Sequence, residues 1–345
     1  MQRRHLPIAA ILLGLLLGHA LIPLSVRAVN NDGQIDILWS DPIAFNNQAW
    51  TMNWTTHINT LTLPSLWSNT NWVMCGYADF NNDGQLDLLW RNPALDLNYV
   101  WFMNGTTYLG SAQLLSTGDT NWMIVGTGYF SSASDKYIDI LWRHKTLGLN
   151  AVWLMQGTNY LQAQALPAVY DMNWAVGGVG DFNQDGMPDI FWNNTYDGRN
   201  SVWYMNGTNF VSSDWATTIS TNYSCAGVGD FNGDNQPDIL WRYRPNGNTY
   251  IWVMNRLAWS STAYVGYQGL NWIVGGLGDS KVDSDSDGMA DLWERNNFGT
   301  LGYSGADDYD GDGWTNLQEY LWGKNPAVPE LNVSVSKPKA SSNVP

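Results

Sequence analysis

A repeat of about 50 residues dominates this sequence and limits the folds open to it. Three segments set the pattern: DFNNDGQLDLLW from Asp79, DFNQDGMPDIFW from Asp181 and DFNGDNQPDILW from Asp230. Two divergent copies begin at Asn30 and Tyr129. Spacings of 51, 52, 50 and 49 residues separate the tryptophans that close the five copies, which are Trp39, Trp90, Trp142, Trp192 and Trp241. This regular period predicts five copies of one supersecondary unit.

Each copy contains short apolar runs separated by Asn, Gly and Asp turns. Runs such as WIVGGLG, DILW and YVWFM predict strands of four to six residues, and a weaker fourth run, for example YLGSAQLL, precedes the next copy. Four short strands per repeat are typical of a β-propeller blade. The competing β-helix has much shorter repeats. We therefore predict an all-β fold, a β-propeller of about five four-stranded blades.

The two ends of the repeat region complement each other. The first copy starts in mid-repeat at Asn30, and the last copy ends on the missing piece, NWIVGGLGD, from Asn271 to Asp279. Pairing these N- and C-terminal strands would complete the first blade and remove two exposed sheet edges. We expect residues 29–280 to form a propeller closed in this way.

The acidic loops of the repeat predict metal sites. The pattern DxNxDGxxD offers side-chain oxygens at positions 1, 3, 5 and 9, with Gly at position 6 for the turn, which suits Ca²⁺ better than Mg²⁺ or zinc. The expected ligands in the second, fourth and fifth copies are Asp79, Asn81, Asp83 and Asp87; Asp181, Asn183, Asp185 and Asp189; and Asp230, Asn232, Asp234 and Asp238. Plain β-turns are the alternative for one isolated loop, but three copies at a fixed phase favour Ca²⁺.

The other two loops are incomplete. The first keeps Asn30, Asp32 and Asp36 but has no acid at position 1, where ring closure would bring Asp279. In the third, Tyr129 replaces the first Asp and two residues are inserted, which leaves Asp135 and Asp139. We expect a site that joins both termini in the first loop, and weak or no binding in the third.

Two further acidic loops follow the repeats. DSDSDGMADLWE and DYDGDGWTNLQE both fit a twelve-residue EF-hand loop, although only short exit helices, near Leu292 and Leu317, are expected. The predicted Ca²⁺ ligands are Asp283, Asp285, Asp287, Asp291 and Glu294, then Asp308, Asp310, Asp312, Asn316 and Glu319. A solvated acidic linker is the alternative. Residues 281–326 are thus predicted to be a calcium-binding loop-helix segment, and residues 327–345 a disordered tail.

The N-terminus predicts export. Residues 1–28 combine a basic start, an apolar stretch and Val26-Arg27-Ala28, as in a cleaved signal peptide; an uncleaved membrane anchor is the alternative. Cleavage would leave no membrane span and a secreted or cell-surface protein. The net charge of −15 argues against nucleic acid as a partner. Cys75 and Cys225, the only cysteines, provide no disulfide framework.

The spaced DxNxDGxxD loops resemble the FG-GAP or VCBS repeat, the calcium-loop blade of integrin α-chain propellers and of many secreted bacterial proteins. The resemblance covers about residues 29 to 280. It implies Ca²⁺ between the first two strands of a blade and a role in adhesion or ligand binding. The chain departs from integrin propellers by having five copies where those have seven. The C-terminal loops are similar to dockerin-type or thrombospondin type 3 calcium loops.

Together these features predict a monomeric, non-catalytic module whose propeller surface binds a glycan or an extracellular protein. A docking scaffold that acts through the dockerin-like segment is the alternative, followed by a hydrolase. Only His57 and His144 remain after the leader, and no nucleophile elbow or zinc signature occurs. Fourteen of the 21 tryptophans occupy repeat positions and are predicted to be core. The candidates for ligand contact are the other seven: Trp54, Trp67, Trp215, Trp259, Trp293, Trp314 and Trp322.

Overall fold

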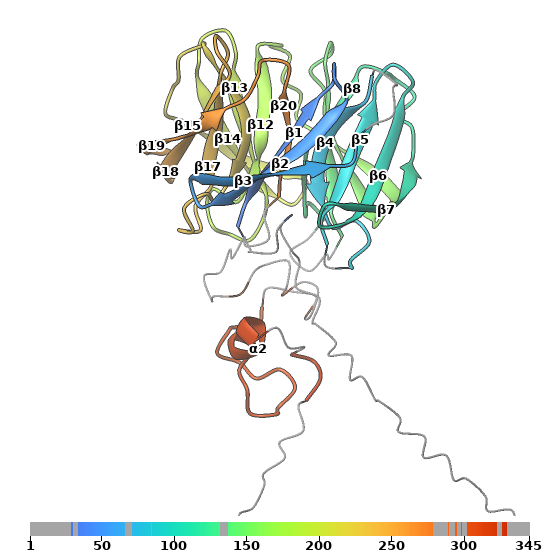
Figure 1. Ribbon diagram of the computed structural model, residues 1–345, viewed down its shortest axis with the longest axis vertical. Coiled ribbons are helices and arrows are strands. Elements are labelled where there is room, and N and C mark those ends of the chain that lie inside the picture. The colour runs from blue at the N-terminus through green and yellow to red at the C-terminus, as the bar shows by residue number, and fades with distance from the viewer. Residues whose placement is uncertain are drawn as a thin grey trace, which may run out of the picture.

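The computed structural model describes residues 29, 34–65, 71–83, 85–131, 137–278, 289, 294, 298, 302–322 and 326–329. Its strands form five four-stranded antiparallel sheets (Figure 1). The prediction of an all-β propeller with five blades is therefore confirmed. Within these described ranges, no helix has the length and apolar character needed to span a membrane.

Each blade runs from a central strand to an outer one. Blade 1 consists of β20 (Ile273–Gly278), β1 (Asp36–Asp41), β2 (Asn46–Asn53) and β3 (Thr56–Leu63). Blade 2 consists of β4 (Val73–Ala78), β5 (Asp87–Asn92), β6 (Leu97–Asn104) and β7 (Thr107–Leu114). Blade 3 consists of β8 (Trp122–Gly128), β9 (Asp139–His144), β10 (Asn150–Gln156) and β11 (Asn159–Leu166). Blade 4 consists of β12 (Trp174–Gly180), β13 (Asp189–Asn194), β14 (Asn200–Asn206) and β15 (Asn209–Ala216). Blade 5 consists of β16 (Tyr223–Gly229), β17 (Asp238–Tyr243), β18 (Asn248–Asn255) and β19 (Ala258–Tyr267).

The strands are longer than the sequence predicted. They span six to ten residues instead of four to six, because the outer two strands of each blade continue as a hairpin up to a two-residue turn. Beyond the propeller, one short helix is described, α2 (Asn316–Trp322), at the position expected for the second exit helix.

Ring closure occurs as predicted. Strand β20 pairs antiparallel with β1, with Asp36 opposite Gly278 and Trp39 opposite Val274. Figure 1 shows these two strands side by side, although they lie at opposite ends of the repeat region. The last strand of the propeller thus completes the sheet that the first strand begins.

The central strands approach one another too closely for side chains at some positions. A Cβ atom on Gly126 would lie 2.8 Å from Cγ2 of Val179 in the next blade, and a Cβ on Gly178 would lie 2.8 Å from Val228. The five central strands surround a cavity of about 700 Å³. Glycines that face a side chain of the next blade therefore allow this narrow ring to close.

The closing tryptophans link neighbouring blades. All five are at most 1% exposed. In three blades the arginine that follows this tryptophan places its guanidinium 5.0–5.1 Å from the ring in the next blade: Arg91 over Trp142, Arg143 over Trp192 and Arg242 over Trp39. These cation–π contacts stabilise three of the five blade interfaces.

A side-chain network supports these arginines, and blade 5 departs from it. In blade 3, Arg143 donates from Nη1 to Oδ1 of Asn150 at 3.0 Å, and Nδ2 of Asn150 donates to the carbonyl of Pro167 at 2.7 Å. Blade 5 has Thr249 where the other blades have Asn. There, Nη1 of Arg242 and Oγ1 of Thr249 are both buried without a hydrogen-bond partner among the described residues.

Candidate metal sites

The acidic loops of the blades connect the first and second strands. The loop of Asp79 joins β4 to β5, that of Asp181 joins β12 to β13, and that of Asp230 joins β16 to β17. This is the place that the resemblance to FG-GAP repeats implies. All three loops therefore lie at the same end of the propeller.

The loop of blade 5 folds around its own carboxylates. The Asp230 carboxylate accepts N–H bonds from Asp234 at 3.3 Å and from Asn235 at 2.8 Å. The Asn232 side-chain oxygen accepts the N–H of Asp234 at 3.0 Å, and the Asp234 carboxylate accepts that of Gln236 at 2.9 Å. The side-chain oxygens at positions 1, 3 and 5 are thus turned into the loop.

The other two complete blade loops repeat this scheme. The four equivalent bonds of the loop that begins at Asp181 measure 2.8–3.1 Å. In the loop that begins at Asp79, the three equivalent bonds to positions 1, 3 and 5 measure 2.8–3.2 Å. At position 6, Asn235 takes a φ of 61° where Gly186 takes 81°, so this Asn adopts the left-handed backbone that Gly usually supplies at this turn.

The ninth-position carboxylates have a structural role that the sequence did not indicate. Asp87 accepts the N–H of Phe80 through Oδ2 and that of Met103 through Oδ1, both at 3.0 Å. An equivalent N–H bond from a buried methionine to the ninth-position Asp occurs in all five blades, at 2.8–3.0 Å. Asp139 keeps it although its loop has lost the first Asp. The presence of an Asp at position 9 of a loop that has lost its first Asp was the sequence signal for this structural role.

Burial and mutual repulsion make these loops electrostatically unfavourable when the carboxylates are ionised without a cation. Burial, with a smaller contribution from Asp79 and Asp83, raises the pKa of Asp87 to about 8. Burial raises the pKa of Asp189 and of Asp238 to about 7 in the same way. A divalent cation at these loops would favour the ionised carboxylates.

The first and third loops lie largely outside the described residues. Asn30, Asp32 and Asp279 of the first, and Asp135 of the third, are among the positions not described. Asp36 is fully buried and accepts the N–H of Met52 at 3.0 Å. The predicted site between the two termini therefore stays a prediction.

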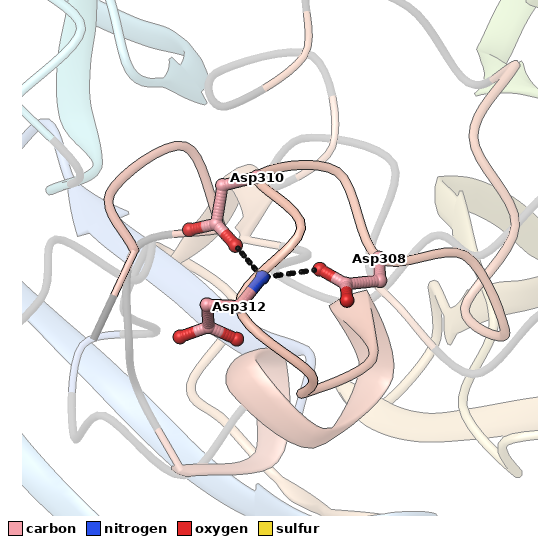
Figure 2. Close-up of side chains that lie close together, drawn as sticks. All are labelled: Asp308, Asp310 and Asp312. Atoms are coloured by element: carbon pink, nitrogen blue, oxygen red, sulfur yellow. Dashed lines mark hydrogen bonds between the residues drawn. The ribbon is translucent and has the colours of Figure 1, made fainter. Parts of the chain in front are cut away.

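The second C-terminal loop brings three carboxylates together. One oxygen from each of Asp308, Asp310 and Asp312 lies within 4.8 Å of the others. Figure 2 shows the Asp308 and Asp310 carboxylates both accepting the backbone N–H of Asp312, at 3.2 and 3.3 Å. Burial and the neighbouring carboxylates of Asp312 and Asp308 raise the pKa of Asp310.

This loop uses the same hydrogen-bond scheme as the blade loops. Asn316 accepts the N–H of Tyr309 at 3.0 Å, as Asp87 accepts that of Phe80, and Asp312 accepts the N–H of Trp314 at 2.9 Å. Asn316 and Glu319 are fully buried. Of the first C-terminal loop, only Glu294 among the predicted ligands is described, and it is buried; Asp283, Asp285, Asp287 and Asp291 are not described.

The donor chemistry of the described loops fits Ca²⁺. Every complete loop presents carboxylate or amide oxygens at positions 1, 3 and 5, which are the hard oxygen ligands that Ca²⁺ takes, and none presents a thiol or an imidazole. In the blades, Asp79, Asp181 and Asp230 with their partners at positions 3 and 5 would hold the ion. The ligand role expected for the ninth-position Asp87, Asp189 and Asp238 stays a prediction, beside the hydrogen bonds that these carboxylates accept from the loop backbone.

Trp54 of blade 1 contacts the loop of the neighbouring blade 5. It lies in the β2–β3 turn with a φ of 54°, where blades 2, 3 and 4 have Gly. A Cβ atom on Gly233 would lie 2.3 Å from Cη2 of Trp54, so the indole lies against this loop. Left-handed backbone is strained at a bulky residue. Trp54 nevertheless adopts it, and its aromatic ring lies beside a candidate metal site.

Comparison with known proteins supports the assignment of the repeats. The five sheets define the class, a five-bladed β-propeller. Residues 181–241 match the FG-GAP-like repeat. The FG-GAP-like repeat is therefore confirmed for this segment, and the five sheets confirm the propeller; the likeness of the C-terminal loops to dockerin-type or thrombospondin type 3 loops stays a prediction.

Similar solved structures share little sequence with this chain. Glutaminyl cyclase of Myxococcus xanthus is 7% identical, over 56% of this chain and 72% of that one, with a TM-score of 0.35. The Tc holotoxin pore of Photorhabdus luminescens is 11% identical, over 75% and 12%, with a TM-score of 0.37. The Dos1 propeller is 12% identical, over 65% and 55%, with a TM-score of 0.33. No curated protein sequence matches the chain.

Proposed function

We propose that this protein is a monomeric, Ca²⁺-stabilised recognition propeller that acts at the cell exterior and binds a glycan or protein ligand without catalysis. One observation carries the calcium part: three blade loops and one C-terminal loop use the same hydrogen bonds to turn carboxylate oxygens inwards. The FG-GAP-like propeller supports a recognition or adhesion role. The leader at residues 1–28 supports export.

The two cysteines and the two described histidines support a non-catalytic role. Burial raises the pKa of Cys75 and of Cys225 to about 12, so both are neutral thiols at physiological pH and poor nucleophiles. His144 is buried and its Nε2 lies 3.0 Å from the Asp119 carboxylate. His57 stacks on a repeat tryptophan with ring centres 4.3 Å apart. Each of these groups has a structural contact.

Thermal unfolding tests calcium binding directly. One Ca²⁺ at 100 times its dissociation constant stabilises the folded state by about 2.7 kcal/mol, so calcium should raise the melting temperature of metal-free protein and EGTA should reverse the rise. Mg²⁺ at the same concentration is the control. Melting curves that are identical in Ca²⁺ and EGTA would refute the proposal.

Terbium luminescence can identify individual sites. Tb³⁺ substitutes for Ca²⁺ and emits when a nearby indole transfers energy to it. Trp314 stands at position 7 of the C-terminal loop, and Trp54 lies against the fifth-blade loop. Trp314→Phe should remove the emission from the first of these sites, and Trp54→Phe that from the second. Trp259→Phe is the matched control, and excess Ca²⁺ should quench all site-specific emission.

A further inference from the structure

An exposed arginine lies over two tryptophan rings at one end of blade 4. Trp174 begins β12, Arg199 precedes β14 and Trp215 lies near the end of β15. The Arg199 guanidinium carbon is 5.6 Å from the Trp174 ring centre and 5.5 Å from that of Trp215, and the two ring centres are 6.0 Å apart. We call these three residues, with Asp197, the blade 4 stack. It lies at the opposite end of the blade from the Asp181 loop, because Trp174 begins the strand that this loop follows.

Asp197 fixes the orientation of the guanidinium. Nε of Arg199 donates to Oδ2 of Asp197 at 2.8 Å, and the backbone N–H of Arg199 donates to Oδ1 at 3.0 Å. With side chains 48% and 34% exposed, this ion pair adds little stability, but it determines where the guanidinium points. Within the described chain, the terminal amino groups of Arg199 donate no hydrogen bond. A planar guanidinium held in this way suits bidentate pairing with a carboxylate.

The propeller repeat does not require this cluster. Trp215 is 64% exposed, and the residues at the equivalent register of blades 2 and 3 are Gln113 and Ala165. The position of Arg199 is occupied by Leu149 in blade 3. Both departures from the repeat occur in blade 4 and contact each other, which indicates a role specific to this blade.

We propose that the blade 4 stack binds a carboxylate-bearing pyranose, such as a galacturonate residue of a polysaccharide. The apolar face of the sugar ring would stack on the exposed Trp215 indole, while the ring carboxylate pairs with the free amino groups of Arg199. A uronate joins an apolar face and a carboxylate in one rigid unit of this size, whereas an acidic peptide side chain has no such face. This inference names the ligand class of the recognition function proposed above and rests on it.

Binding of defined oligosaccharides to the intact, calcium-loaded protein tests the proposal. Calorimetric titration with a galacturonate hexamer should show saturable binding, and neutral maltohexaose should bind at least tenfold more weakly. The protein has a net charge of −15, so non-specific attraction cannot account for binding of a polyanion. Equal binding of maltohexaose would overturn the proposal, as would preference for sulfated maltohexaose or for a glutamate hexapeptide.

Substitutions in the stack complete the test. Trp215→Ala and Arg199→Gln should each weaken galacturonate binding by about tenfold or more, and Trp215→Phe should retain most of it. Tyr264→Ala and Arg256→Gln alter an exposed aromatic residue and an exposed arginine of blade 5 and should leave the affinity unchanged. Unchanged affinity in both stack variants would overturn the assignment. The calcium-dependent melting shift of each variant, measured separately, reports on the proposed calcium function alone.

Discussion

The ninth-position aspartates allow the structural and metal-binding roles of the loops to be separated by mutation. Asp139 and Met155 are both fully buried, and the Asp139 carboxylate accepts the Met155 N–H at 2.8 Å. Asp139→Ala leaves that N–H without this acceptor, which should lower the free energy of unfolding by about 1–3 kcal/mol. The loop of Asp139 lacks the first Asp and is expected to bind Ca²⁺ weakly or not at all. The loss of unfolding free energy should therefore be the same with Ca²⁺ and with EGTA.

Asp83→Asn should show the opposite pattern. In the structure the Asp83 carboxylate accepts the Gln85 N–H at 2.8 Å. The side-chain oxygen of Asn can accept the same bond, so the stability of the variant in EGTA should be nearly unchanged. The lost charge should abolish Ca²⁺ binding at this loop, which removes about 2.7 kcal/mol of stabilisation at a Ca²⁺ concentration of 100 times the dissociation constant. Guanidinium unfolding followed by tryptophan fluorescence measures both variants. A calcium-dependent loss in Asp139→Ala, or an equal loss in EGTA for Asp83→Asn, would refute the assignment of roles.

Three further predictions concern the protonation of Asp87, the hydrogen-bond network around Arg242 in blade 5, and the close approach of the central strands. Burial raises the pKa of Asp87 to about 8, so the folded metal-free protein keeps a proton that the unfolded chain releases near pH 4. The melting temperature of the metal-free protein should therefore fall as the pH rises from about 5 to 8, and saturating Ca²⁺ should remove this fall. A melting temperature of the metal-free protein that does not change with pH would contradict the reasoning. Thr249→Asn restores the amide acceptor that Arg242 lacks and should stabilise the protein by about 1 kcal/mol in denaturant titrations; a destabilised variant would show that the blade 5 network differs for another reason. Gly178→Ala places a Cβ 2.8 Å from the next blade and should cost about 1–3 kcal/mol, while Gly110→Ala, which meets no atom within 4 Å, is the control and should be nearly neutral.

The repeat made the architecture predictable. The phase difference between a copy that starts at Asn30 and one that ends at Asp279 was sufficient to predict the pairing of β20 with β1. Strand lengths were underestimated because the apolar pattern fades on the exposed outer strands. On β15, for example, every residue before Ala216 is exposed.

The site details were less predictable, for two physical reasons. An Asp that binds a metal ion and an Asp that accepts backbone N–H bonds look the same in a sequence, so the ligand pattern did not indicate the hydrogen bonds of Asp87. Only Asp139, which is present in a loop without the first Asp, pointed to this second role. The blade 4 stack depends on contacts between residues far apart in the sequence. Trp215 was a contact candidate because it falls outside the repeat positions, but nothing local to Arg199 indicated that it lies over two indole rings.

The pairing of β20 with β1 also has a consequence for biogenesis. Within the propeller, β1 is synthesised before every other strand, and its neighbour β20 is synthesised more than 200 residues later. Blade 1 is therefore begun first and finished last, while blades 2 to 5 can each form from contiguous sequence. Until β20 arrives, the inner edge of β1 stays unpaired, and this is the interval in which the nascent protein is most open to edge-to-edge association with other chains.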